Sequence, residues 1–154
     1  MSNSLAKTLV AIFDGAFVGP NGDYPSVLEA LADVTASQAL WKPSSESNSI
    51  WQITDHLIAS KEWLMEMLAK GEASSPIWTQ PSGDEAAWQA TLNRLHEAYE
   101  LLKTRLGQLT DDDLLKPPAP DLTQTLLELL LSSGSHHDAH HSGQIDYLKG
   151  LQSK

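Results

Sequence analysis

The sequence predicts an all-α protein, a four-helix bundle with short extra helices in its connections. Long stretches that are nearly free of proline and glycine carry apolar residues at helical spacing. The prolines gather between these stretches, where helices must end. No segment alternates polar and apolar residues over the length of a strand. With 154 residues, of which 41% are hydrophobic, the chain is expected to form a single domain over residues 1–154.

The first predicted helix covers about residues 4–17. The residues expected to share its apolar face are Leu5, Leu9, Ile12 and Ala16. The segment GPNGDYP interrupts the pattern, and its Asn21-Gly22 pair is a strong turn signal. A shorter helical piece follows, whose in-phase residues are Val27, Leu28 and Leu31.

The second long helix is predicted to begin at Ser49, because Gln52 completes a capping box three residues later. Its apolar residues are Ile53, Leu57, Leu64 and Met67 or Leu68. Gly71 is the expected C-cap, since glycine tolerates the left-handed conformation that often ends a helix.

The third long helix is expected to begin at a second capping box, Ser82 to Glu85. It has the most regular apolar pattern in the chain, formed by Trp88, Leu92, Leu95, Tyr99, Leu102 and Leu106. The segment Thr110–Asp113 is expected to cap a short turn. The last helix covers about residues 122–151, and its apolar line contains Leu127, Leu130, Gly134, His137, His141, Ile145 and Leu148.

Four of the six histidines lie between positions 136 and 141. Residues four apart on a helix share a face and can bind one metal ion together. The tract holds two such pairs, His136 with His140 and His137 with His141. The second pair continues the apolar line through Ile145, but apolar residues flank the first pair as well. Helical phase therefore leaves both pairs open.

A tight metal site needs a third ligand from another helix, and His56 is the candidate because it lies beside the apolar stripe of the second helix. His96 lies one place off the stripe of the third helix and is expected at the surface. An inward histidine is often only a hydrogen-bonded core residue, and a histidine-rich tract can be merely solvated. Burying several imidazoles without partners would cost several kcal/mol, which a shared metal ion would remove.

These residues resemble the DinB/YfiT-like superfamily of metalloenzymes. The likeness rests on His56 within SIWQITDHLIASKEWL and on the motif HDAHHSGQI at residues 137–145. The segments FDGAF and GPNGDYPSVLEAL are also similar to its DinB-like branch. The resemblance implies a bundle in up-down-down-up order, a divalent metal bound by three histidines, and a homodimer.

Alignment on the Gly143-Gln144 step of this motif implies that His137 and His141 are the ligands that join His56. His136 and His140 then lie outside the ligand set, with His136 expected at the surface. Gly143 is expected to let a neighbouring helix approach closely, because it has no Cβ. Asp138 stands where zinc peptidases with an H-E-x-x-H motif have glutamate, so the motif gives no argument for a peptidase.

Three neutral histidines leave at least one position of a divalent ion open to water or substrate. The chain has no cysteine, so a thiolate in that position must come from a small molecule. The resemblance implies relatives that are transferases and isomerases dependent on low-molecular-weight thiols. Zinc is the expected metal, although nickel, iron and copper also suit three imidazoles. No residue presents itself as a general base, and five tryptophans could line a pocket, Trp63 and Trp88 being expected in the core.

The sequence therefore predicts a metal-dependent enzyme that acts on a small molecule, either a thiol-dependent S-transferase or a hydrolase. The alternatives are a non-catalytic bundle that binds a metal or ligand, and a dimeric interaction module with incidental histidines. The formal net charge of −10 argues against binding to nucleic acid or to an anionic membrane surface. The chain shows neither a secretion signal nor a run of about 18 apolar residues, and a cytoplasmic location is expected.

Overall fold

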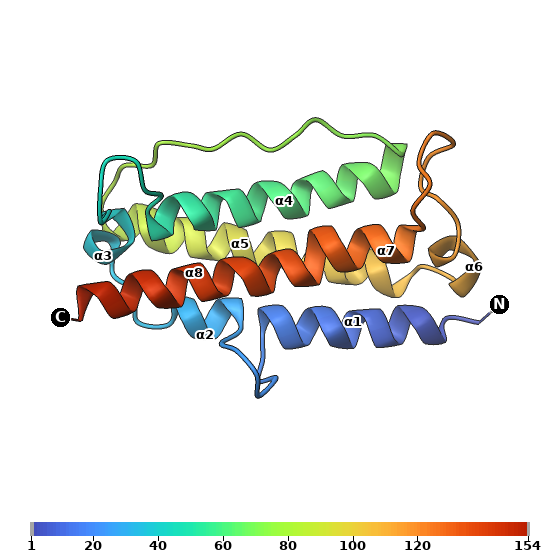
Figure 1. The fold of residues 1–154 in the computed structure, drawn as a ribbon, viewed down its shortest axis with the longest axis horizontal. Coiled ribbons are helices and arrows are strands. Elements are labelled where there is room, and N and C mark those ends of the chain that lie inside the picture. The colour runs from blue at the N-terminus through green and yellow to red at the C-terminus, as the bar shows by residue number, and fades with distance from the viewer. Residues whose placement is uncertain (1, 154) are drawn as a thin grey trace.

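The computed structural model describes residues 2–153, and every regular element in this range is a helix, which confirms the predicted all-α class. The elements in chain order are α1 (Ser4–Phe17), α2 (Val27–Leu31), α3 (Ala36–Leu40), α4 (Ile50–Lys70), α5 (Glu85–Gly107), α6 (Asp111–Leu114), α7 (Leu126–Leu130), the π-helical turn η1 (Leu131–Ser135) and α8 (His136–Gln152). Elements α7, η1 and α8 continue one another and form the last long helix (Figure 1).

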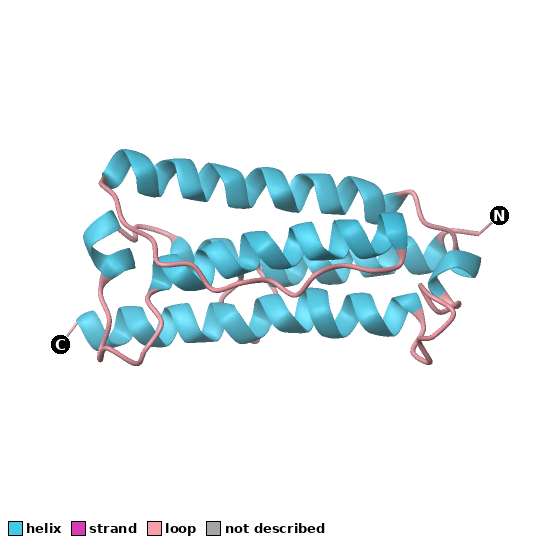
Figure 2. Cartoon of the chain, turned by 90° about the horizontal axis from the view of Figure 1, so that it is seen from above, coloured by secondary structure: helices cyan, strands magenta, loops and turns pink. Residues whose placement is uncertain are grey.

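The four long helices of the bundle, α1, α4, α5 and the last helix, pack side by side (Figure 1). The colour gradient shows that α1 and α8 run in one direction, whereas α4 and α5 run in the other. Helices α4 and α5 can be parallel because residues 72–84, which connect them in the chain, return along the length of the bundle on its outer side (Figures 1 and 2). None of the helices described has both the length and the apolar character needed to cross a bilayer.

Local hydrogen bonds set the ends of α4 as the sequence predicted. The Ser49 side chain accepts from the backbone N–H of Gln52, and the Gln52 side chain accepts from the backbone N–H of Ser49. Gly71 ends the helix with φ of 76°, a left-handed conformation that costs glycine little. The same reciprocal capping by Thr110 and Asp113 opens α6.

The predicted starts of two other helices were wrong. Helix α5 begins at Glu85 without a capping box, because the Asp84 carboxylate, rather than the Ser82 hydroxyl, accepts from the backbone of Ala87. The last helix begins at Leu126 and not near residue 122, since Thr125 and Glu128 form its capping box. In both cases the residue that caps the helix lies further along the chain than the predicted start.

The core confirms most of the predicted apolar faces. In α5, the buried side chains include Trp88, Leu95, Tyr99, Leu102 and Leu106. In α1, however, Ile12 is 43% exposed, and the residues that face the core are Ala6, Leu9, Phe13, Ala16 and Phe17. Two helical lines through Leu9 were available, and the one that contains the two phenylalanines buries more apolar area.

A glycine allows the closest approach between α1 and the last helix. A Cβ added to Gly134 would lie 2.2 Å from Cζ of Phe13, so only glycine fits beneath that ring. The close approach predicted for Gly143 was wrong. Gly143 is exposed, and a Cβ there would meet nothing within 4 Å.

The π-helical turn η1 changes which residues of the last helix face the core. A π turn holds one more residue than an α turn, and one residue corresponds to about 100° of rotation. Extended as a continuous α-helix, the buried face of α7 would be centred on Ser133, His137, His140 and Gln144. The buried residues observed at these turns are Gly134, Asp138, His141 and Ile145. The face is displaced by one position along the chain.

Candidate metal centre

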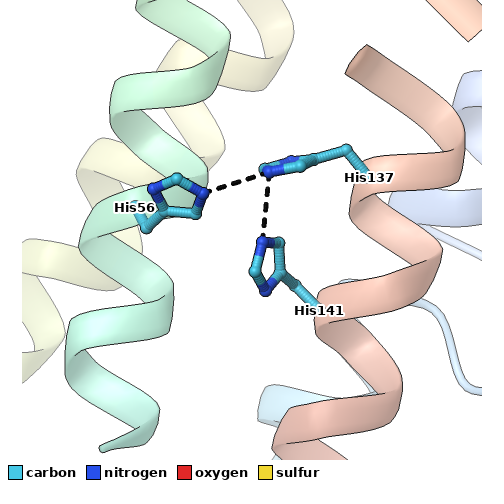
Figure 3. Close-up of side chains that lie close together, drawn as sticks. All are labelled: His56, His137 and His141. Carbon is cyan, nitrogen blue, oxygen red and sulfur yellow. Dashed lines mark hydrogen bonds between the residues drawn. The ribbon is translucent and has the colours of Figure 1, made fainter. Parts of the chain in front are cut away.

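Three histidines from two distant segments meet between α4 and α8 (Figure 3). Nε2 of His137 lies 3.1 Å from Nε2 of His56 and 3.1 Å from Nε2 of His141. One nitrogen from each ring lies within 4.8 Å of the others. These are the three residues that the sequence singled out as metal ligands.

The local sequence explains how each ring reaches the cluster. The capping box at Ser49 fixes the start of α4, and His56 follows two turns later, on the side facing α8. His137 and His141 are one turn apart on α8, so their rings project in the same direction (Figure 3). Because η1 displaces the buried face by one residue, His141 is buried, His137 is half-buried at its edge, and His140 is exposed.

The chemistry of the three rings fits a shared cation better than mutual hydrogen bonding. A ring nitrogen carries either one proton or one lone pair, yet Nε2 of His137 has two other ring nitrogens at 3.1 Å. Nitrogens bound to one ion at about 2.0–2.1 Å lie roughly 3.0–3.4 Å apart. Two of the three nitrogen–nitrogen distances match this spacing, and three lone pairs directed at one ion would satisfy all three atoms. The donor set therefore fits a divalent metal.

The environment keeps the rings in the neutral state that binds metals. Burial lowers the pKa of His137 to about 3, with the neighbouring histidines adding to the effect. Burial also lowers the pKa of His141 to about 4, although the hydrogen bond to Gln144 opposes this shift. Burial likewise lowers the pKa of His56. At neutral pH no proton competes for the lone pairs of these rings.

Gln144 orients one of the rings. Nδ1 of His141 donates to Oε1 of Gln144 at 2.7 Å, which leaves Nε2 of His141 as the nitrogen with a free lone pair. Nε2 of Gln144 in turn donates to Nε2 of His140 at 3.2 Å, so His140 supports the cluster indirectly. His136 is exposed, as predicted. Among residues 2–153, Nδ1 of His56 and Nδ1 of His137 have no hydrogen-bond partner.

Trp78 covers His56. Its indole stacks on the imidazole with 4.2 Å between ring centroids and 10° between planes. Thr79 anchors the segment next to it, since its carbonyl accepts from Gln52 at 2.9 Å and its hydroxyl donates to Asp55 at 2.7 Å. Asp55 is thereby engaged by Thr79 and not by His56. The sequence marked Trp78 only as one of five tryptophans, because nothing local indicates that residues 72–84 fold back over α4.

A buried ion pair beside the cluster was missed by the sequence analysis. Nζ of Lys61 donates to Oδ1 of Asp138 at 2.7 Å, and Nζ also lies 4.9 Å from the centre of the Phe17 ring. Burial raises the pKa of Asp138, and the Lys61 charge works against that rise. Asp138 faces inward because the π-helical turn displaces the buried face of α8. Nothing in the sequence indicated that displacement.

The cluster contains no fourth ligand among the residues described. His56, His137 and His141 form the only group there with metal-binding proximity. The acidic residues next to the ligands in the chain are engaged elsewhere, since Asp138 is bound to Lys61 and Asp55 to Thr79. His96, predicted to lie outside the site, is exposed on α5. A metal held by these three rings would keep at least one position for water or a substrate atom.

Comparison with known proteins places this arrangement in a family. The model of the DinB superfamily matches residues 24–145, a range that includes all three histidines of the cluster. No curated protein and no solved structure gives a significant match to the chain. Since the matched range covers most of the sequence, and since the helical fold and histidine cluster agree with the resemblance noted in the motif, the chain belongs to the DinB superfamily.

Proposed function

We propose that this protein is a divalent-metal-dependent enzyme that transfers a small thiol onto an electrophilic substrate. The observation that carries the proposal is the convergence of three neutral imidazoles from two helices without a fourth protein ligand in the described range. His56, His137 and His141 would hold the ion. A divalent ion bound there supplies Lewis acidity to the substrate atom that takes its remaining position.

The surrounding residues favour a thiol transferase over a hydrolase. A hydrolase gains rate from a carboxylate that removes a proton from the metal-bound water, but Asp138 is bound to Lys61 and Asp55 is bound to Thr79. A thiol is far more acidic than water and reacts as the thiolate, so its proton can leave to solvent without a protein base. The chain itself has no cysteine, and the thiol is therefore a cosubstrate.

The proposed step forms a bond between the thiol sulfur and an electrophilic carbon. The sulfur supplies the electron pair, and the leaving group departs with the pair that bound it to carbon. In this step Gln144 holds the His141 ring, Trp78 covers His56, and the buried rings stay neutral because protonating them is unfavourable. Zinc is the proposed ion, because three imidazoles and an open position suit it.

The test combines metal content with turnover. Untagged protein should bind one zinc ion per chain after reconstitution, measured by mass spectrometry of the metal. It should then accelerate the reaction of 2-mercaptoethanol with 1-chloro-2,4-dinitrobenzene, in which the C–S bond forms and chloride leaves. His141→Ala should abolish both properties, whereas His96→Ala, which changes an exposed histidine, should preserve them.

The outcomes separate the alternatives. Protein that never retains an ion stoichiometrically contradicts the proposal. Protein that binds zinc, unfolds when the ion is chelated and catalyses no transfer would instead be the non-catalytic metal-binding bundle, because a structural metal contributes folding free energy. We also propose the homodimer that the resemblance implies. The mass of the protein in solution, measured with and without chelator, tests it separately.

A further inference from the structure

A pocket of about 290 Å³ lies beside the histidine cluster. It is bounded by α4, by residues of the 72–84 segment and by the π-helical turn η1. His56 and His137 form part of its wall, so a molecule in the pocket would lie next to the ring nitrogens that converge in Figure 3. The pocket is at the lower end of the roughly 300–1,000 Å³ usual for ligand sites, which suits one ring with a short chain.

Away from the metal position, the pocket wall carries no counter-charge for an anion, because no lysine or arginine lines it. Apart from the two histidines, the described residues that line it are serines, a proline and Trp63. The nearby Lys61 is unsuited to bind a ligand carboxylate, because its charge is buried and already bound to Asp138. An ionised carboxylate placed there, away from the metal position, would lose hydration without gaining a charged partner.

Two of the four hydroxyl groups in the wall present acceptors and not donors. Ser60 Oγ donates to the carbonyl of His56 at 2.8 Å, and Ser132 Oγ donates to the carbonyl of Leu129 at 3.2 Å. A hydroxyl has one proton, so both oxygens have only lone pairs left for a ligand. A ligand amide or alcohol could donate to them, whereas a carboxylate could not.

Trp63 gives the pocket its flat apolar surface. It was expected in the core, but its side chain is half-buried and forms part of the pocket wall. An indole in such a position favours an aromatic or apolar group stacked against it.

We infer that this pocket binds the body of a compact, uncharged substrate that donates hydrogen bonds and places an apolar group on Trp63. The one ionisable atom of that substrate is then directed to the three-histidine site. The inference rests on the proposed function, because the metal position is what the ionisable atom would bind. It adds the specificity of the site, namely the selection of neutral amide- or alcohol-bearing molecules over those with carboxylates.

A matched pair of thiols tests this selection. The probes are 4-(mercaptomethyl)benzamide and 4-(mercaptomethyl)benzoate, which have nearly the same shape and differ in charge. Each is titrated into cobalt-loaded protein, and binding is followed by the visible absorption of the cobalt ion. The benzamide should bind at least about tenfold more tightly, a difference of roughly 1.4 kcal/mol that an unpaired carboxylate readily exceeds.

Substitutions of tryptophan locate the effect in the pocket. Trp63→Ala should weaken benzamide binding by about tenfold, since the stacking surface is lost. Trp63→Phe should restore most of the affinity, which separates loss of stacking from a failure to fold. Trp41→Ala is the matched control, because Trp41 is an exposed tryptophan outside the pocket wall, and it should leave both affinities unchanged.

The results distinguish the inference from the function beneath it. Equal affinity for the two thiols, or tighter binding of the benzoate, would overturn the inference and leave the proposed function intact. Unchanged affinity in Trp63→Ala would overturn it as well. If the cobalt spectrum responds to neither thiol, or if cobalt is not retained, the proposed function itself fails.

Discussion

Lys61 of α4 and Asp138 of α8 form an ion pair in the core, with 2.7 Å between Nζ and Oδ1 and side-chain exposures of 3% and 2%. The pair joins the same two helices as the histidine cluster, and Asp138 directly follows His137 in the chain. The second carboxylate oxygen, Oδ2, has no hydrogen-bond partner among residues 2–153. Each charge therefore depends on the other for compensation.

Removing one member of this pair should destabilise the protein strongly. We expect Lys61→Met to lower the free energy of unfolding by about 3–5 kcal/mol, because it leaves the Asp138 carboxylate buried without a partner. The double substitution Lys61→Met with Asp138→Leu should recover most of that loss. Urea unfolding followed by circular dichroism measures both. Lys70→Met, which removes an exposed ion pair with Glu66, is the control and should change little. A small effect of Lys61→Met would show that the pair is energetically unimportant.

Gln144 should contribute to metal affinity through His141. We expect Gln144→Ala to weaken zinc binding by about 10–100-fold, since the imidazole loses the acceptor that fixes its orientation and tautomer. Gln144→Glu should keep or increase the affinity, because a carboxylate is a stronger acceptor for the same N–H. Competition with a chelator of known affinity measures the change. Unaltered binding by Gln144→Ala would mean that packing alone orients the ring.

Two glycines of the last helix should respond in opposite directions to alanine. Gly134→Ala is expected to cost about 1–3 kcal/mol, because its Cβ would collide with the Phe13 ring. Gly143→Ala is expected to stabilise the helix by roughly 0.5–1 kcal/mol, since the new methyl group meets no neighbour. Thermal unfolding of the two variants gives the comparison. Phe13→Leu should relieve part of the Gly134→Ala defect, and destabilisation by Gly143→Ala would contradict the assignment of free space there.

The metal-free protein should lose stability as the pH falls below about 6.5. Burial lowers the pKa of His137 to about 3 and that of His141 to about 4, whereas an unperturbed histidine titrates near 6.5. The unfolded chain thus binds protons at a higher pH than the folded chain, so protons favour unfolding. The contribution of these histidines is complete above pH 6.5 and declines as the pH is lowered toward 4.

Urea midpoints measured from pH 8 to pH 4.5 test this dependence. The double substitution His137→Leu with His141→Leu should flatten the curve between pH 6.5 and pH 4.5. His96→Ala should keep the slope of the unmodified protein, because His96 is exposed on α5 and lies outside the cluster. A slope that survives the double substitution would assign the effect to other groups.

Much of the fold follows from local sequence signals. The capping residues Ser49 and Thr110, the terminal glycine Gly71 and the apolar spacing in α5 are each read from a few neighbouring positions, and the structure contains all of them. The signals failed where two local solutions competed. In α1 the line through Ile12 and the line through Phe13 have the same period, and tertiary packing, which includes the contact of Phe13 with Gly134, distinguishes them.

The candidate site was predictable in its residues and not in its surroundings. Helical spacing offered two histidine pairs on the last helix, and the resemblance to the DinB/YfiT-like superfamily selected His137 and His141 to join His56. The cover by Trp78 and the pocket wall at Trp63 depend on how the 72–84 segment returns along α4, and that segment has no regular pattern. The partnership of Lys61 with Asp138 joins positions 77 residues apart, which one sequence cannot reveal.

The π-helical turn at Leu131–Ser135 decides which histidines of the last helix reach the cluster. If the same residues closed into α-helical turns, everything after Ser135 would rotate by about 100°, and His140 would take the inward place of His141. Because a π turn accommodates one residue more than an α turn, deleting Ser132 or Ser133 would instead let the last helix run as an unbroken α-helix with His137 and His141 still at the cluster. The extra residue in this turn therefore sets the orientation of the cluster relative to the leucines of α7.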